Sequence, residues 1–242
     1  TVHNLEGVLL LQEMGFERVV LSRELSLEDI RYITAHCQVE IETFVHGALC
    51  VCYSGQCLMS SMIGGRSGNR GRCAQPCRLP YTLVDETGAD VLGKDAGQFL
   101  LSPKDLKTIE LLPELLESGI ASLKIEGRMK RPEYVAVVVD AYRRAIDAVE
   151  AGRGLPSAAE DEKALAQIFN RDFTTAYLKE RPGRTMMSDS RPNNRGLLVG
   201  RVLENDRTAG RVKLKLSGDL AEGDQLDFWV KVGGRKTATV TD

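Results

Sequence analysis

The sequence predicts an α/β fold: the C-terminal part of a TIM-like (β/α) barrel, followed by a small antiparallel β-barrel-like module. Helical and strand-like periods alternate, with short connections, at the start of the chain and again from residue 99, which is typical of βα units around a parallel sheet. From Gly196 onward the apolar period changes to two, which indicates antiparallel strands. We count about four strands of parallel type where a closed barrel needs about eight. We therefore expect a fragment of a longer chain.

Local signals support each element before the first interruption. Apolar residues at helical spacing stop at Gly15, a residue typical of helix C-termini, and a β-branched run follows. Ser26 and Asp29 approximate a capping box at the start of the next helix. An alternating, β-rich run then predicts a second strand. The elements expected here are a helix at 2–15, a strand at 17–22, a helix at 26–36 and a strand at 39–46.

The alternation resumes after a long insertion. A short apolar run precedes Pro103, and Pro132 stands suitably at the first turn of a helix. The elements expected here are a strand at 99–102, helices at 103–118, 132–150 and 158–169, and a strand at 121–125. A polar loop at 181–195 leads to four short strands within 197–204, 210–217, 224–232 and 236–242. We expect a partial barrel at 1–155, a helix and linker at 156–195, and an incomplete β module at 196–242.

Composition and charge exclude several classes. The chain has 242 residues, 43% of them hydrophobic, and a formal net charge of −2, so it has neither the bias of a disordered protein nor a bulk positive charge for nucleic acid. No apolar run is long enough for a membrane span, and no signal peptide opens the chain, so we expect a cytoplasmic protein without a membrane partner. The charge distribution is less neutral than its sum. Residues 43–84 contain no acidic residue, and they hold Arg66, Arg70, Arg72 and Arg78.

Five of the six cysteines lie in the same acid-free segment, within a Gly-rich loop at 47–80 that precedes a small hairpin of 81–84 with 90–92. Cys50, Cys57, Cys73 and Cys77 are separated by six, fifteen and three residues. Disulfides need an oxidising compartment, and zinc prefers paired short spacings, which only the last two approach. An iron–sulfur cluster, held by thiolates at irregular spacing, fits better. Buried free thiols that bind no metal are the alternative interpretation for these four cysteines. For Cys37 and Cys52, a buried free thiol is the favoured interpretation.

Three polar residues near predicted strand ends are candidates for proton transfer. Glu42 and His46 lie on one strand, where alternation predicts a shared face, and Glu126 closes a later strand. An ion pair with the adjacent basic stretch is an equal interpretation for Glu126. His46 and Cys50 could form a nucleophilic pair, although no partner that would orient it is evident. The zinc-protease motif H-E-x-x-H and the hydrolase motif G-x-S-x-G are absent.

These residues carry a family resemblance. The segment ETFVHGALCVCYSGQCLMS, residues 42–60, resembles the signature of the peptidase U32 family, with Met59 where that signature usually has Leu or Ile. The continuation GGRSGNRGRCAQPCRLPY is similar to the branch that includes an rRNA cytidine hydroxylase and collagenase-like proteases. The blocks LSRELS, LSPKDL, LKIEGRMKRPEY and NRDFTTAYL extend the resemblance over about residues 1–180.

The resemblance implies more than the residues do alone. It implies an incomplete barrel whose first strands precede Thr1, and a [4Fe–4S] cluster on Cys50, Cys57, Cys73 and Cys77. The better-understood relatives hydroxylate RNA bases or the ubiquinone ring without oxygen. The RNA-modifying relatives draw on prephenate, and the ubiquinone ones work as heterodimers, so the resemblance adds an oligomer to the expected partners. The C-terminal β module is similar to small barrels found after the catalytic domain in this family.

We therefore expect an iron–sulfur-dependent, oxygen-independent RNA hydroxylase that acts on rRNA cytidine or tRNA uridine. A collagenase-like peptidase and a non-catalytic, metal-stapled binding module are the alternatives. In the first hypothesis Glu42, His46 and Glu126 handle protons, and Arg128 holds an anionic co-substrate. Arg66, Arg70 and Arg72 offer a local positive surface to an RNA loop whose unstacked base enters the site.

Overall fold

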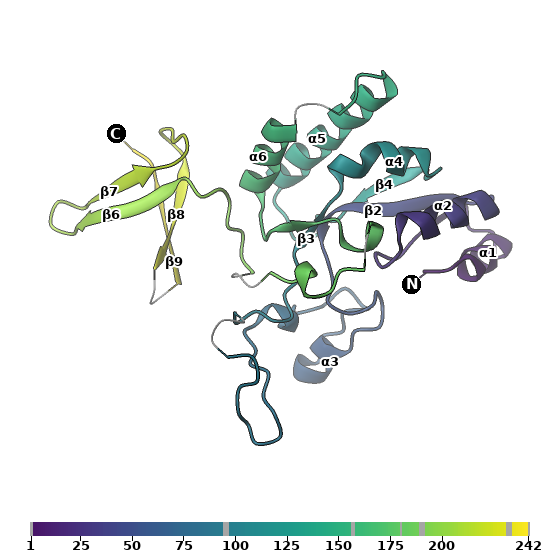
Figure 1. The fold of residues 1–242 in the computed structure, drawn as a ribbon, viewed down its shortest axis with the longest axis horizontal. Coiled ribbons are helices and arrows are strands. Elements are labelled where there is room, and N and C mark those ends of the chain that lie inside the picture. Colours follow the sequence, from purple (N-terminus) through teal and green to yellow (C-terminus); the bar gives the residue numbers. More distant parts are fainter. Residues whose placement is uncertain are drawn as a thin grey trace. The chain divides into compact units, whose positions relative to one another are not determined.

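The computed structural model describes residues 2–93, 97–155, 158–179, 181–188, 192–230 and 234–241. They form two compact units, Thr1–Gly196 and Leu197–Asp242. The first unit holds a five-stranded mixed sheet with helices, and the second holds two small antiparallel sheets (Figure 1). The α/β class and the antiparallel C-terminal module are thus confirmed. The described strands close no barrel, so the TIM-like part stays a prediction.

The sheet is organised around its longest strand, β2 (Glu40–Ala48). β1 (Arg18–Val20) and β4 (Ser122–Ile125) run parallel to β2, whereas β3 (Asp105–Lys107) runs antiparallel to it and parallel to β5 (Phe173–Thr174). One residue of β2 pairs with both β1 and β4, and another pairs with both β3 and β4. Since a strand has only two edges, β1 and β3 share one edge of β2 and β4 takes the other.

The strands predicted at 17–22, 39–46 and 121–125 are confirmed, but the one predicted at 99–102 is wrong. The strand lies instead at Asp105–Lys107, inside the predicted helix 103–118, and it is antiparallel to β2. Two of its three residues are charged, and both are buried. Arg171 neutralises Asp105, and Glu110 and Glu162 neutralise Lys107. An apolar pattern cannot identify such a strand, because its partners come from distant parts of the chain.

The helices follow the predicted order with one shortening. Ser26 and Asp29 form the expected capping box, with the Asp29 amide donating to Ser26 Oγ at 3.1 Å. The predicted helix 103–118 is reduced to a 3₁₀ turn at Ile109–Leu111 and one short α-helix. The helices of the sheet region are α1 (Leu5–Glu13), α2 (Leu27–His36), α4 (Leu112–Glu117), α5 (Pro132–Glu150) and α6 (Ala158–Ile168).

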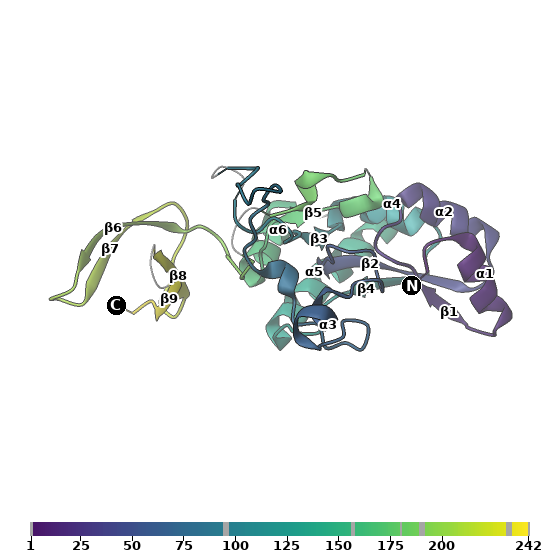
Figure 2. The same ribbon diagram turned by 90° about the horizontal axis from the view of Figure 1, so that it is seen from below.

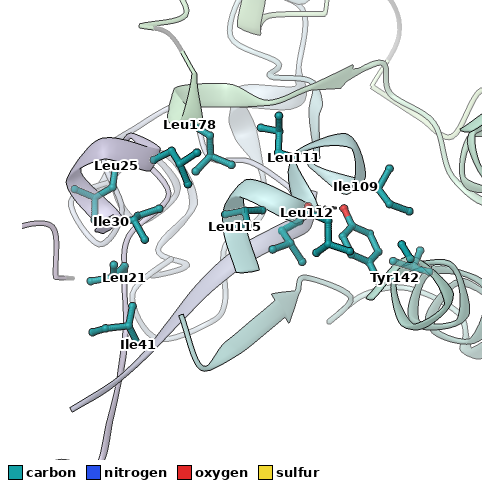
Figure 3. Close-up of a cluster of buried hydrophobic side chains, with 14 of the residues drawn as sticks. Leu21, Leu25, Ile30, Ile41, Ile109, Leu111, Leu112, Leu115, Tyr142 and Leu178 are labelled. Atoms are coloured by element: carbon teal, nitrogen blue, oxygen red, sulfur yellow. Dashed lines mark hydrogen bonds between the residues drawn. The ribbon is translucent and has the colours of Figure 1, made fainter. Parts of the chain in front are cut away.

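One apolar core joins the sheet to these helices. Ile41 of β2, Ile30 of α2, Leu112 of α4 and Tyr142 of α5 lie in a single cluster of buried side chains (Figure 3). A smaller cluster contains Leu49, which follows β2, together with Leu106 of β3, Ala176 and Met186. Ile41 and Val45 of β2 thus pack in the main cluster, and Leu49, directly after β2, packs in the smaller one. Packing on both sides of this point fixes the positions of the residues at the end of β2.

The loop after β2 contains two short elements, α3 (Met59–Gly64) and a 3₁₀ turn at Pro76–Arg78. In both views α3 stands apart from α2 and α4 (Figures 1 and 2). The hairpin predicted at 81–92 is reduced to one bridge, Val84 with Asp90. The loop is thus built mostly from turns, as its glycines and sparse apolar residues predict.

The second unit consists of two hairpins, β6 (Gly200–Asp206) with β7 (Arg211–Leu216) and β8 (Gln225–Val230) with β9 (Gly234–Thr239). No described side chain of this unit is buried. The first residues of the predicted helix and linker at 156–195, part of the loop predicted at 181–195, and the ends of the strands predicted at 224–232 and 236–242 lie outside the described residues. Among the described helices, none has the length and apolar character that crossing a membrane requires.

Candidate functional site

The C-terminal ends of β2 and β4 lie in close backbone contact. The Glu126 amide donates to the His46 carbonyl at 2.8 Å, directly after β4 ends. Gly47 has a φ of +107°, and a Cβ atom at Gly47 would overlap the Glu126 backbone carbonyl. Only glycine tolerates both conditions without strain. The close approach sets the Glu126 side chain beside the beginning of the cysteine-rich loop.

Glu42 and His46 lie on opposite faces of β2, so the prediction of a shared face is wrong. Phe44 pairs with Lys124, but His46 pairs with the next residue, Ile125, because the register shifts between them. Such a bulge adds one residue to one strand and reverses the alternation beyond it. The sequence pattern cannot reveal this bulge, because Thr43 and Val45 alternate as in a regular strand.

Glu42 is engaged in a local ion-pair group on its own face. Its carboxylate accepts a hydrogen bond from Ser122 at 2.8 Å and lies 3.1 Å from the Lys124 ammonium. Burial alone would raise the pKa of Glu42, but the hydrogen bonds from Ser122 and Lys124 and the charge of Arg18 hold it below its usual value. Glu42 therefore supports β2, β4 and β1 together and does not join the other two proton-transfer candidates.

His46 is a neutral imidazole in the core. Its residue is 1% exposed, and burial lowers its pKa to about 4, with the nearby charge of Asp105 opposing this shift and those of Lys107 and Lys130 adding to it. The ring lies edge-on to Tyr142, with centroids 5.6 Å apart, and also contacts Tyr134 and Phe173. At neutral pH this imidazole can accept or donate a hydrogen bond without carrying charge.

The hydrogen bonds around Tyr142 select one tautomer of His46. The Tyr142 hydroxyl accepts from the Thr108 amide at 3.1 Å, donates to the Val45 carbonyl at 2.8 Å and lies 3.4 Å from His46 Nδ1. Because the hydroxyl has a single proton, directed at Val45, Nδ1 must be the donor in the third contact. Nε2 is then the unprotonated nitrogen of His46, available as an acceptor.

Glu126 keeps a partly exposed carboxylate at the end of β4. One oxygen accepts from the Arg128 amide at 3.0 Å, and the other lies 3.3 Å from the Arg23 guanidinium. Arg23 stacks on the Phe44 ring at 3.8 Å, and burial lowers its pKa, an effect that Glu126 and Cys50 oppose. The expected ion pair therefore exists, but with Arg23 rather than with the basic stretch after β4. The Glu126 carboxylate remains accessible to solvent.

Two groups in this region are not identified by the sequence pattern. Lys130 folds back over the rings of Phe169 and Tyr134, although it belongs to the basic stretch that follows Glu126. Asp105 and Arg171 form a buried ion pair, in which both guanidinium Nε and Nη2 donate to the carboxylate. The blocks LSPKDL and NRDFTTAYL contain this pair, which was a signal available in the sequence.

Arg78 ties the end of the cysteine-rich loop to the sheet. Its guanidinium donates to the Leu49 carbonyl at 3.1 Å, to Ser102 Oγ at 2.7 Å and to the Pro103 carbonyl. Burial lowers the pKa of Arg78 to about 10, with Arg171 as a second cause, and it remains a cation at neutral pH. This arginine, one of the four in the acid-free segment, serves to anchor the loop and is not free for RNA.

The four predicted thiol ligands influence one another. Burial raises the pKa of Cys50, and Cys57 and Cys73 raise it further as like charges, while Arg23 lowers it. Burial likewise raises the pKa of Cys77, with contributions from the same three thiols, and Arg78 opposes it. All four therefore belong to one local group, to which Cys52 is also close, because Cys57 acts on its pKa. Cys37 instead packs against the core.

The residues fit an iron–sulfur cluster in their chemistry. Four thiols in one local group, with Arg23 and Arg78 nearby, are the ligands and counter-charges that such a cluster requires. Across the described residues, no three His, Cys, Asp or Glu side chains are spaced to hold a metal ion. Cluster binding would thus draw the thiols closer together.

Arg66, Arg70 and Arg72 are exposed on the loop between Cys57 and Cys73. Arg66 donates to the Arg72 carbonyl at 3.0 Å, which fixes this turn. Arg128 reaches the same loop from the end of β4, since a Cβ atom at Gly71 would overlap its guanidinium. The three loop arginines thus present positive charge to solvent, and Arg128 joins the loop to Glu126.

Comparison with known proteins identifies the family. The family described as Peptidase family U32 matches residues 1–188. The chain is 39% identical to tRNA hydroxylation protein P1 of Bacillus subtilis (95% of this chain, 56% of that protein). It is 38% identical to the 23S rRNA 5-hydroxycytidine C2501 synthase of Escherichia coli (95% and 35%) and 36% identical to a collagenase of Porphyromonas gingivalis (86% and 54%).

No solved structure matches the chain. The chain spans about half the length, or less, of these three relatives. The family match covers the sheet, the cysteine-rich loop and the region around Glu126 and His46, and it ends before the second unit. The chain belongs to peptidase family U32.

Proposed function

We propose that the whole protein is a cytoplasmic, oxygen-independent RNA hydroxylase that modifies a pyrimidine of rRNA or tRNA. The observation that carries the proposal is that two relatives matching 95% of this chain are named for hydroxylation of tRNA and of 23S rRNA cytidine. The local geometry supports it, because exposed arginines, the group of thiols and Glu126 lie around one loop.

Cys50, Cys57, Cys73 and Cys77 would hold a [4Fe–4S] cluster, which supplies one-electron redox chemistry when bound. Arg23 and Arg78 offset its negative charge. Both guanidiniums already lie close enough to the thiols to alter their pKa values.

The chain's own residues then bind and orient the substrate. Arg66, Arg70 and Arg72 contact phosphates, so that an unstacked base reaches the end of β2 and β4. Arg128 holds an anionic oxygen-donating co-substrate, for which we propose prephenate. Glu126 passes the proton released by the reacting base to solvent, because its carboxylate is the partly exposed acid at this strand end. The neutral imidazole of His46 accepts a hydrogen bond at its unprotonated Nε2 and in this way helps to orient the groups of the site.

The decisive experiment is mass spectrometry of rRNA and tRNA nucleosides from cells that lack the full-length protein. We expect loss of a 5-hydroxylated pyrimidine and its restoration by the wild-type gene. Glu126→Gln should leave RNA affinity and iron content within about twofold of wild type but restore less than about 1% of the modification, as expected for loss of an acid–base group. Unchanged hydroxylated pyrimidines, together with loss of gelatin cleavage, would instead establish the peptidase alternative.

A further inference from the structure

Lys130 occupies a distinctive position at the end of the sheet. Its amide donates to the Gly127 carbonyl at 2.9 Å, which closes a turn directly after β4. The turn leaves Arg128, Met129 and Arg131 exposed and folds the Lys130 side chain inward. Its ammonium lies over the Phe169 ring and 5.4 Å from the centre of the Tyr134 ring. Tyr134 is fixed in turn, since its hydroxyl donates to the Glu126 carbonyl at 3.2 Å.

The ammonium lacks the partners that a structural lysine has. Within the described part of the chain, the Lys130 ammonium makes no hydrogen bond and no ion pair. Asp105, the acid whose charge acts most strongly on Lys130, is already held by two nitrogens of Arg171. Lys107, which is buried where Lys130 is half-buried, is paired with both Glu110 and Glu162. An ammonium whose three donors lie over aromatic rings, without a hydrogen-bond acceptor in the described chain, is suited to a ligand rather than to the fold.

The charges that face Lys130 come from every element around it. Asp105 of β3 and Glu126 after β4 favour its charged form, whereas Arg171 before β5 and Arg78 of the 3₁₀ turn disfavour it. His46 of β2 lies within reach of its charge but is itself neutral. Burial is the largest influence, and together these lower the pKa of Lys130 to about 7. Near neutral pH the side chain is therefore divided between amine and ammonium.

We propose that Lys130 is a further catalytic residue of the hydroxylation, an amine that takes up a proton from the substrate bound at the ends of β2 and β4. The inference rests on the proposed function. The rings of Phe169 and Tyr134 keep water from one side of Nζ, and its donors and lone pair are left for the substrate. Glu126, on the same strand end, then exchanges protons with solvent.

The proton balance defines the step. Replacement of a pyrimidine ring hydrogen by hydroxyl is a two-electron oxidation, for which the organic oxygen donor is the oxidant. As the ring carbon forms its new C–O bond, the C–O bond of the donor breaks, and its electron pair stays on the donor carbon, which takes up a proton from solvent. The ring C–H bond then breaks, its electron pair returns to the ring, and the proton forms a new N–H bond on Lys130. Transfer of this proton to solvent through Glu126 restores the amine.

The first test uses the full-length protein with its cluster and RNA from a strain that lacks the protein. Lys130→Arg keeps a cation over the rings but cannot give up a proton near neutral pH. We expect it to retain the melting temperature, iron content and RNA affinity of wild type and to lose hydroxylation about 100-fold or more. Lys130→Ala should show a similar loss, which added ethylamine should partly restore. The matched control, Arg131→Gln on the exposed side of the same turn, should stay within about twofold of wild type.

Lys130→Arg activity within about threefold of wild type would overturn the proposal, and so would a failure of ethylamine to restore any activity to a folded Lys130→Ala variant. The amine can also be tested without turnover. Trace acetic anhydride labels deprotonated lysines, and peptide mass spectrometry reads each lysine of the folded protein against pH. We expect half-maximal labelling of Lys130 near pH 7, and a midpoint above pH 9 would overturn the proposal. If wild type restores no hydroxylated nucleoside, the proposed function fails, and the labelling midpoint still decides the state of Lys130.

Discussion

The imidazole of His46 is held neutral by its surroundings. Its hydroxyl partner, Tyr142, is directed at the Val45 carbonyl, and three aromatic rings surround it. In the folded chain its pKa is about 4, against an ordinary value of 6.5. Below about pH 6.5 the imidazole binds a proton in the unfolded chain more readily than in the folded chain, so acidification favours unfolding. The stability that His46 contributes is fully present above about pH 6.5 and is lost as the pH falls towards 4.

This linkage predicts acid sensitivity of the fold. Between pH 7 and pH 5 the free energy of unfolding should fall by about 2 kcal/mol on account of His46. His46→Gln, which is neutral throughout this range, should start less stable but lose less on acidification. Urea unfolding of both chains at the two pH values measures the difference. Parallel losses in the two chains would show that His46 is not the group that titrates.

At the scale of elements, the cysteine-rich loop has few apolar contacts of its own. Arg78 anchors its end to Leu49 and Pro103, and Gly71 lies against Arg128. We attribute the remaining order of the loop to ligation of the cluster by its thiols. Under the proposed ligation, metal binding and local folding of this loop would be the same event.

Ligation as a unit predicts a sharp division among the cysteines. Serine at any one of positions 50, 57, 73 or 77 should remove most of the iron from anaerobically purified full-length protein. Cys37→Ser and Cys52→Ser should retain it. Iron analysis and the visible absorption band measure the result. Cys52→Ser is the demanding control, because this thiol lies close to Cys57. Damage equal to that of Cys57→Ser would contradict the assigned ligands.

The exposed arginines of the loop make a separate prediction. Arg70→Ala and Arg72→Ala should each weaken binding of rRNA or tRNA, and each should reduce the slope of log affinity against log salt by about 0.7 to 0.9. Iron content should not change. Arg143→Ala removes an exposed arginine of α5 that is paired with Asp147, so it is the matched control. A salt slope that Arg70→Ala leaves unaltered would remove this residue from the RNA surface.

At the scale of the molecule, the two units differ in how much they bury. The first unit has a continuous core that includes Val8, Ile41, Leu115 and Val138. In the second unit no described side chain is buried, and Leu198, Leu203 and Trp229 are 77%, 60% and 42% exposed. A unit of this size buries too little surface to offset the entropy of ordering its chain.

We therefore predict that residues 197–242 do not fold alone. The isolated segment should show narrow amide dispersion in NMR spectra and no cooperative thermal transition. Residues 1–196, with the larger core, should melt in a sigmoidal transition. A cooperative transition in the isolated C-terminal segment would show that its two hairpins bury more than these side-chain exposures indicate.

Local sequence determined the features whose causes lie close together in the chain. The capping box of Ser26 and Asp29, the alternation of β2 up to Val45 and the proline at the start of α5 each act within a few residues, and the structure confirms all three. The change of period after Gly196 likewise predicts the two hairpins. The residues of the family signature also identify the family over most of the first unit.

Only the tertiary structure decided the features whose causes lie far apart. The strand Asp105–Lys107 exists because Arg171 and Glu162 neutralise charges that a local pattern assigns to solvent. His46 leaves the face of Glu42 because β4 pairs with a shifted register. Lys130 turns inward because Phe169, nearly forty residues later, provides an aromatic surface. Burial of a charge depends on the partners that the whole fold brings to it, and no window of sequence contains them.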